Sequence, residues 1–173
     1  MKVIGLCGYS GSGKTTLAER LIPRLRLDGQ RVSVVKHAHH DFDIDHEGKD
    51  SWRHRQAGAF EIVIASNRRL AKMREYPETA EPTAHDLIAE LGDCDWVLVE
   101  GFKHAALLKL EVWRAATGKL AHYPNDPFVF AIATDSAAEF PVPTGLPVFD
   151  LDDADGIAEF LMRNRLRFEY VPP

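Results

Sequence analysis

Residues 8–16 read Gly8-Tyr9-Ser10-Gly11-Ser12-Gly13-Lys14-Thr15-Thr16. Residues 8–15 satisfy G-x-x-x-x-G-K-[ST], the pattern of a phosphate-binding loop, or P-loop. Glycines let such a loop curl until consecutive N–H groups face phosphate oxygens, and the following helix adds its positive N-terminal dipole. The lysine reaches the β- and γ-phosphates, and the next hydroxyl binds Mg²⁺. The segment therefore predicts a nucleotide site.

The candidate nucleotide-binding residues follow from this pattern. They are Gly8, Ser10, Gly11, Ser12, Gly13, Lys14, Thr15 and Thr16. Lys14 is also a candidate catalytic residue, and Thr15 a candidate Mg²⁺ ligand. The pattern requires a strand before it and a helix after it. Residues 3–7 are apolar and predict a buried strand, and residues 15–27 carry apolar side chains at helical spacing, which argues against a turn that binds nothing.

Strands and helices alternate along much of the chain. We expect helices over 50–57, 83–91 and 152–165, and strands over 32–35, 61–65, 70–74, 96–99, 108–113 and 128–133. Three prolines make 141–147 an extended connection. This order predicts an α/β fold with a mostly parallel, doubly wound sheet. The middle of the chain departs from the rule, because several strands follow one another there without helices.

Size and composition narrow the classes of protein further. The chain has 173 residues, which predicts a single nucleotide-binding domain over 1–173. Its formal net charge of −5 does not suit non-specific nucleic-acid binding. The cysteines, Cys7 and Cys94, lack C-x-x-C spacing, so we expect a reducing cytoplasm and a small core residue at Cys7. The chain leaves no room for a signal peptide, and no apolar run predicts a membrane span.

Beside the P-loop, a nucleotide site also needs an acidic residue. We expect it at the end of an apolar strand, where a carboxylate can hold Mg²⁺ directly or through water. Residues 96–101 read Trp-Val-Leu-Val-Glu-Gly, and Glu100 occupies that place. A solvated carboxylate at a strand end is the alternative interpretation. The apolar strand before it favours Glu100 as a metal ligand.

The base-reading residue is less well defined by the sequence. P-loop GTPases bind the guanine edge with the aspartate of an N/T-K-x-D pattern after a late strand. Asp135 follows the expected strand 128–133 in a comparable place, but the lysine of the pattern is missing. Asp135 is therefore a candidate guanine-binding residue, and a helix cap or turn residue is the alternative.

Residues 36–46 form an unusual His/Asp segment, KHAHHDFDIDH, after the second expected strand. Three interpretations remain open: acids that assist Mg²⁺ or place a water, histidines that bind a transition metal, or a solvated loop. A calcium loop is excluded because His46 replaces its glycine and Trp52 its final glutamate. His37, His39 and His40 lack cysteine partners or H-E-x-x-H spacing for zinc or nickel.

These segments together resemble the MobB family, the GTP-binding proteins of molybdopterin guanine dinucleotide biosynthesis. The resemblance lies in the P-loop, in K-H-A-H-H-D at 36–41 with G-K-D-S at 48–51, and in V-E-G-F-K at 99–103. It extends over nearly the whole chain, including residues 55–59. The K-H-x-H-H-D and E-G-F-K motifs are far more specific than the P-loop alone.

The resemblance implies a P-loop NTPase fold with an extended β portion used for dimerisation, hence a homodimer. It implies GTP and Mg²⁺ as ligands, with slow intrinsic hydrolysis at most. It also implies two partners, the guanylyltransferase that joins GMP to molybdopterin, and molybdopterin or its molybdenum form. In that pathway the chain would be an accessory factor and its partner would perform the nucleotidyl transfer.

The resemblance also assigns residues. Gly11, Gly13, Lys14, Thr15 and Thr16 match the family's phosphate cradle, and Glu100 matches the acid of E-G-F-K. Lys49 matches the lysine of G-K-D, and Lys103 matches the last lysine of E-G-F-K. Asp43 and Asp45 are the candidate catalytic acids.

Two other functions remain open on the same scaffold. One is a small-molecule kinase, which would need an acceptor pocket and an arginine-rich lid. Its candidate arginines are Arg53, Arg55, Arg68 and Arg69. The other is a non-enzymatic metal or cofactor carrier that nucleotide binding switches between conformations.

Overall fold

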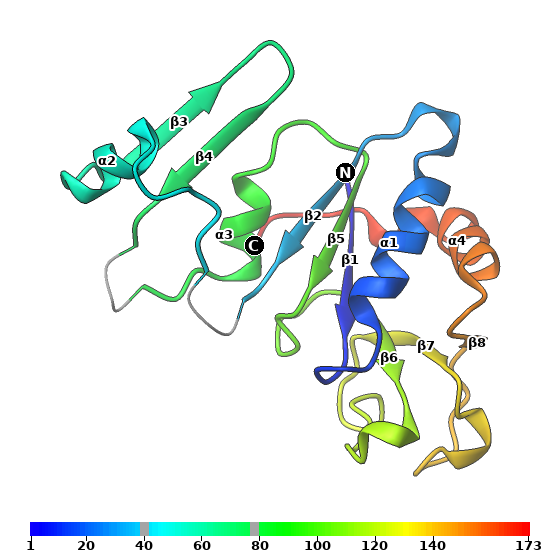
Figure 1. The fold of residues 1–173 in the computed structure, drawn as a ribbon. Helices are drawn as coiled ribbons and strands as arrows, with labels where there is room; N and C mark the ends of the chain where they lie inside the picture. Colours follow the sequence, from blue (N-terminus) through cyan, green and yellow to red (C-terminus); the bar gives the residue numbers. More distant parts are fainter. Residues whose placement is uncertain (39–41, 77–79) are drawn as a thin grey trace. The chain divides into compact units, whose positions relative to one another are not determined.

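The computed structural model describes residues 1–38, 42–76 and 80–173. They form two compact units (Figure 1). The sheet unit comprises Met1–His37 and Thr83–Pro173, and the hairpin unit comprises Ala38–Pro82. The single domain expected over 1–173 stays a prediction.

The sheet unit is built on a six-stranded sheet with the order β2-β5-β1-β6-β7-β8. The strands are β1 (Lys2–Cys7), β2 (Val32–Lys36), β5 (Trp96–Glu100), β6 (Lys109–Trp113), β7 (Val129–Thr134) and β8 (Val148–Asp150). All neighbouring strands pair in parallel. The expected mostly parallel, doubly wound sheet is therefore confirmed. β8 escaped the sequence analysis because its three residues follow the proline-rich connection too closely to show a strand pattern.

Helices cover both faces of this sheet (Figure 1). α1 (Lys14–Leu25) and α4 (Ala154–Arg163) pack on one face, where Leu21 and Ile157 are fully buried against Leu6 and Leu98. α3 (Ala84–Ala89) packs on the other face with its buried Ile88. Burial on both faces explains why the central strands read as continuous apolar runs. Each large buried side chain contributes about 1.5–3 kcal/mol to the free energy of folding.

Strand register places the ends of two elements side by side. Leu6 of β1 pairs with Glu100 of β5, so the P-loop begins next to the end of β5. Short 3-10 turns η1 (Leu27–Gly29), η2 (Ala115–Thr117), η3 (Ala137–Glu139) and η4 (Arg165–Phe168) complete the unit. Cys7 is buried as expected, and burial raises the pKa of its thiol to about 12. Within the described ranges, every helix lacks the length and apolar character needed to cross a bilayer.

The hairpin unit contains α2 (Asp50–Gln56) and an antiparallel pair, β3 (Glu61–Ala65) and β4 (Leu70–Arg74). The Ser66 hydroxyl closes the turn between the strands, because it accepts hydrogen bonds from the N–H groups of Arg68 and Arg69. These two strands confirm the expected pair over 61–74. In the part of the chain that the structure describes, β3 and β4 pair only with each other.

Candidate functional site

The P-loop has the backbone conformation that its glycines predict. Gly8, Gly11 and Gly13 have φ angles of 136°, 81° and 102°, in the region that disfavours side chains. A Cβ on Gly8 would lie 2.3 Å from the carbonyl oxygen of Val112, so only glycine fits there. Beneath the loop, Ser12 is buried and its Oγ has no hydrogen-bond partner among the described residues.

Lys14 lies folded back over this loop. Its Nζ donates a hydrogen bond of 2.8 Å to the carbonyl oxygen of Tyr9. Burial lowers the pKa of Lys14, and the nearby charge of Lys36 adds to this effect. An ammonium group held near the loop in this way is ready to exchange one carbonyl for phosphate oxygens.

Thr15 and Glu100 meet at the start of α1. The Thr15 hydroxyl donates to Oε1 of Glu100 at 2.6 Å. Glu100 is only 8% exposed, so it is not a solvated strand-end carboxylate, and Lys36 Nζ lies 3.5 Å from the same oxygen. A hydroxyl and a carboxylate are hard oxygen ligands of the kind Mg²⁺ prefers. This pair fits a magnesium ion beside the P-loop.

The E-G-F-K segment packs against the end of β2. The Phe102 ring stacks on His37 with centroids 4.6 Å apart, and the His37 N–H donates to the carbonyl oxygen of Glu100 at 2.9 Å. Gly101 has a φ of 99°, and a Cβ there would come within 2.9 Å of the His37 side chain. His37, a candidate metal ligand by sequence, therefore has a packing role here. His39 and His40 lie outside the described residues.

Lys103, matched to the last lysine of E-G-F-K, lies beside the P-loop. Its Nζ is 5.5 Å from the ring centroid of Tyr9, within cation–π range. Its backbone is held by the buried Lys109, whose Nζ donates to the Lys103 carbonyl at 2.9 Å and pairs with Asp126 at 2.5 Å. Lys109 thus fixes the loop that follows β5.

Glu111 fixes the loop that follows β6. It is fully buried and accepts hydrogen bonds from the backbone N–H groups of His122 at 2.6 Å and Tyr123 at 2.7 Å. His122 then stacks on Tyr9 with centroids 4.8 Å apart. Burial raises the pKa of Glu111 and lowers that of His122. The sequence analysis missed Lys109 and Glu111, although two charges inside the apolar run 107–113 were a visible signal.

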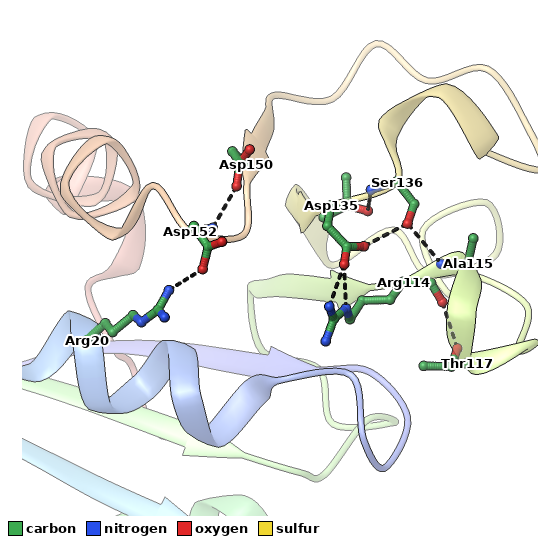
Figure 2. Close-up of polar contacts among 9 residues, drawn as sticks. Arg20, Arg114, Ala115, Thr117, Asp135, Ser136, Asp150 and Asp152 are labelled. Atoms are coloured by element: carbon green, nitrogen blue, oxygen red, sulfur yellow. Dashed lines mark hydrogen bonds and ion pairs between the residues drawn. The ribbon is translucent and has the colours of Figure 1, made fainter.

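Asp135 borders a pocket of about 200 Å³ beside the first turn of α1. The pocket is lined by Gly13, Thr16, Leu17, Arg20, Arg114, Asp135, Leu151 and Asp152. Figure 2 shows the two ion pairs that border it, Arg114 with Asp135 and Arg20 with Asp152. Asp135 directly follows β7, and the residue before η3 is Ser136, so Asp135 is not the cap of that turn. Sequence reasoning named Asp135 as a candidate but did not name its three charged neighbours, and the role of Asp135 stays a prediction.

Asp43, Asp45 and Lys49 belong to the hairpin unit, where Arg55 engages both acids. Asp43 Oδ2 accepts from Nη2 of Arg55 at 2.7 Å, while Nε lies 3.3 Å from Asp45 Oδ2, an ion pair without hydrogen-bond alignment. The other oxygen of Asp45 accepts from the Ser51 hydroxyl at 2.8 Å. The backbone N–H of Asp45, followed by Arg55, lowers the pKa of Asp43. Lys49 is exposed just before α2.

Groups of three or more His, Cys, Asp or Glu side chains suited to a metal ion are absent from residues 1–38, 42–76 and 80–173.

Arg55, one of the arginines considered for a kinase lid, forms ion pairs with three carboxylates, since its Nη1 also contacts Glu75 at 3.0 Å. Asp43, Asp45 and Arg55 therefore form an internal ion-pair network of the hairpin unit. The catalytic roles of the two acids stay a prediction.

Comparison with known proteins gives consistent results. A family model described as molybdopterin guanine dinucleotide synthesis protein B matches residues 3–135. A molybdopterin-guanine dinucleotide biosynthesis adapter protein of Haemophilus influenzae is 40% identical over 163 residues, which are 92% of this chain and 86% of that protein. The Escherichia coli protein of the same description is 35% identical over 162 residues, with 92% and 91% covered. A crystal structure of molybdopterin-guanine biosynthesis protein B superposes with a TM-score of 0.67 at 30% identity, covering 94% of this chain and 99% of that one.

Proposed function

The chain belongs to the MobB family of molybdopterin guanine dinucleotide synthesis proteins, and on this premise we propose that it binds GTP with Mg²⁺. It is an adapter protein of molybdopterin-guanine dinucleotide biosynthesis. We further propose that it acts in the cytoplasm and assists the guanylyltransferase that uses molybdopterin or its molybdenum form. The observation that carries nucleotide binding is the Thr15–Glu100 hydrogen bond at the mouth of the P-loop.

Each residue of the P-loop has a role in this proposal. The N–H groups of residues 8–16 cradle the phosphates, and Lys14 exchanges the Tyr9 carbonyl for the β- and γ-phosphate oxygens. Thr15 and Glu100 would hold Mg²⁺, which when bound neutralises negative charge between these phosphates. Lys49 and Lys103 are further proposed contacts to the nucleotide.

Hydrolysis is proposed to be weak. Asp43 and Asp45 are the proposed acids, and Arg55 contacts both of them. A general base works best when its pKa lies near the working pH. The pKa of Asp43 is instead lowered by the Asp45 N–H and by Arg55, which makes it a poor proton acceptor.

The choice of base tests this function. Guanine presents its N1–H and 2-amino donors to a carboxylate such as Asp135, whereas adenine presents an acceptor at N1. We expect calorimetric titration to give tighter binding of GTP than of ATP. We expect Asp135→Asn to bind XTP better than GTP, because the asparagine amide accepts from N1–H and donates to the 2-oxo group. Hydrogen bonds to charged groups are worth about 1.5–3 kcal/mol, so GTP affinity should fall roughly ten- to 100-fold.

Asp155→Asn is the matched control for this experiment. Asp155 also forms an exposed pair with an arginine, Arg24, but does not line the pocket. Its nucleotide preference should equal that of the wild type. Equal affinity of the wild type for GTP and ATP would contradict the proposed function.

The hairpin unit supports the further proposal that two copies associate. Val63, Ile64 and Leu70 are 57%, 43% and 67% exposed, and consecutive strand residues point to opposite faces. A two-stranded hairpin alone is marginally stable in water, and its outer edges keep unpaired N–H and C=O groups. A second copy of the hairpin would cover both the apolar side chains and an open edge.

A charge in the middle of this hairpin should separate the copies. We expect Ile64→Glu to shift the protein from dimer to monomer in sedimentation velocity, because Ile64 lies opposite Ala71 and a carboxylate buried there without a cross-strand cation opposes association. Leu166→Glu is the control, since Leu166 is 77% exposed in the sheet unit. A monomeric wild type, or an Ile64→Glu variant that stays dimeric, would refute this surface.

A further inference from the structure

The pocket at Asp135 lacks the cation that its sequence pattern would supply. In N/T-K-x-D the lysine precedes the aspartate by two residues, and Ala133 occupies that position here. Ala133 is fully buried inside β7. β7 therefore contributes the carboxylate for a base but no positive side chain to cover the base.

Arg114 supplies a cation from the neighbouring strand. β6 and β7 pair in parallel with Trp113 opposite Thr134, so the next residues, Arg114 and Asp135, leave the sheet side by side. The Arg114 guanidinium binds Asp135 in a fork, with Nε and Nη2 at 2.7 and 2.6 Å from Oδ2 (Figure 2). The Ser136 hydroxyl donates to the other oxygen, Oδ1, at 2.7 Å. Both oxygens that would read a base are thus occupied.

Separating Arg114 from Asp135 costs little free energy. The side chains of Arg114 and Asp135 are 39% and 38% exposed, and exposed ion pairs contribute little to stability. Arg20 and Asp152 form a second pair across the same pocket, from α1 and from the segment after β8. The pocket between the pairs borders Gly13 and Thr16 at the start of α1, where a nucleotide held by the P-loop would extend its base.

We propose that Arg114 is a specificity-determining residue of the nucleotide site, which exchanges its ion pair with Asp135 for the face of a bound guanine. This assignment rests on the proposed binding of GTP. Guanine offers Asp135 its N1–H and 2-amino donors in place of the guanidinium that Arg114 withdraws. The released guanidinium then lies on the purine ring, a contact that arginine makes well because it is planar and weakly hydrated. Adenine has an acceptor at N1 and no amino group at C2, so it lacks this pair of adjacent donors; Asp135 then keeps Arg114 and the exchange does not occur.

Titration calorimetry with GTP, ATP and inorganic tripolyphosphate tests the assignment. Arg114→Ala should weaken GTP binding about tenfold, since a stacked cation is lost. Tripolyphosphate should bind unchanged, which also shows that the P-loop is intact. ATP affinity should change little, so the ratio of GTP to ATP affinity narrows. Arg114→Lys should keep part of the lost affinity.

Two further arms separate this role from its alternatives. Arg24→Ala is the control, because Arg24 also pairs with an aspartate, Asp155, and neither residue lines the pocket. The Arg24→Ala variant should bind GTP with the affinity of the wild type. In an Asp135→Asn background, Arg114→Ala should weaken XTP by a similar factor, because the guanidinium contacts the ring rather than the carboxylate. Wild-type GTP affinity in Arg114→Ala, beside a wild type that prefers GTP, would overturn this assignment alone. Loss of tripolyphosphate binding would also overturn it, by making Arg114 a phosphate contact. Equal binding of GTP and ATP by the wild type would overturn the proposed function itself.

Discussion

Replacement of Lys14 by alanine is expected to remove nucleotide binding while leaving the fold intact. Lys14 makes one hydrogen bond in the structure, to the Tyr9 carbonyl, which contributes about 0.5–1.5 kcal/mol to the free energy of folding. With nucleotide bound, the same ammonium would face phosphate oxygens in a partly buried site. Loss of one partner of such a charge pair costs about 2–5 kcal/mol, roughly 30-fold or more in affinity.

Thermal unfolding with and without GTP checks this expectation. GTP should raise the melting temperature of the wild type, because a ligand at 100 times its Kd stabilises the folded state by about 2.7 kcal/mol. The Lys14→Ala variant should melt near the wild type without GTP and, at the same GTP concentration, gain at most about a third of that stabilisation. Lys119→Ala, on an exposed turn after η2, is the control and should respond as the wild type does. An undiminished GTP response in Lys14→Ala would disprove the P-loop assignment.

The second large effect concerns Glu100. Glu100→Gln preserves the shape of the side chain, and the Thr15 hydroxyl can still donate to the amide oxygen, but the negative charge beside Lys36 disappears. We expect Mg²⁺ to bind about 10- to 100-fold more weakly in the presence of GTP, the usual loss when a residue that holds or orients a metal ligand is changed.

This effect is measured by titrating Mg²⁺ into the GTP complex. GTP affinity in excess EDTA should be similar in the wild type and Glu100→Gln, because Lys14 and the loop N–H groups remain. Glu159→Gln, which removes a surface partner of Arg163 on α4, should leave the Mg²⁺ dependence unchanged. If Mg²⁺ strengthens GTP binding equally in Glu100→Gln and the wild type, Glu100 has no role at the metal.

The elements that sequence reasoning located share one physical property: each is determined by neighbours along the chain. A P-loop needs glycines where φ is positive, and Gly8, Gly11 and Gly13 have such angles. A strand covered on both faces needs a continuous apolar run, and β5 is buried at every residue. Glu100 was recognisable because an acid at the end of such a run must lie at the carboxyl edge of the sheet. β8 was not recognisable, because three residues are too few to show the hydrophobic pattern of a strand.

The charged partners depended instead on pairing between distant segments. Arg114 and Asp135 are 21 residues apart and meet because Trp113 and Thr134 share a register in β6 and β7. Arg20 and Asp152 are 132 residues apart. Lys109 and Glu111 are charged residues inside an apolar strand, and only the tertiary structure shows their partners. Lys109 contacts Asp126, and Glu111 accepts hydrogen bonds from the N–H groups of His122 and Tyr123.

Asp43 and Asp45 are a further case in which the sequence did not reveal the ion-pair partner. Their pattern indicated candidate catalytic acids, and the tertiary structure joined both to Arg55. The residues of the P-loop could therefore be predicted from the sequence, because backbone conformation and the burial of apolar residues depend on local or nearly periodic patterns. Which charges neutralise one another was settled only by folding, because a charge pair acts across a few ångströms of space and leaves no fixed spacing in the sequence.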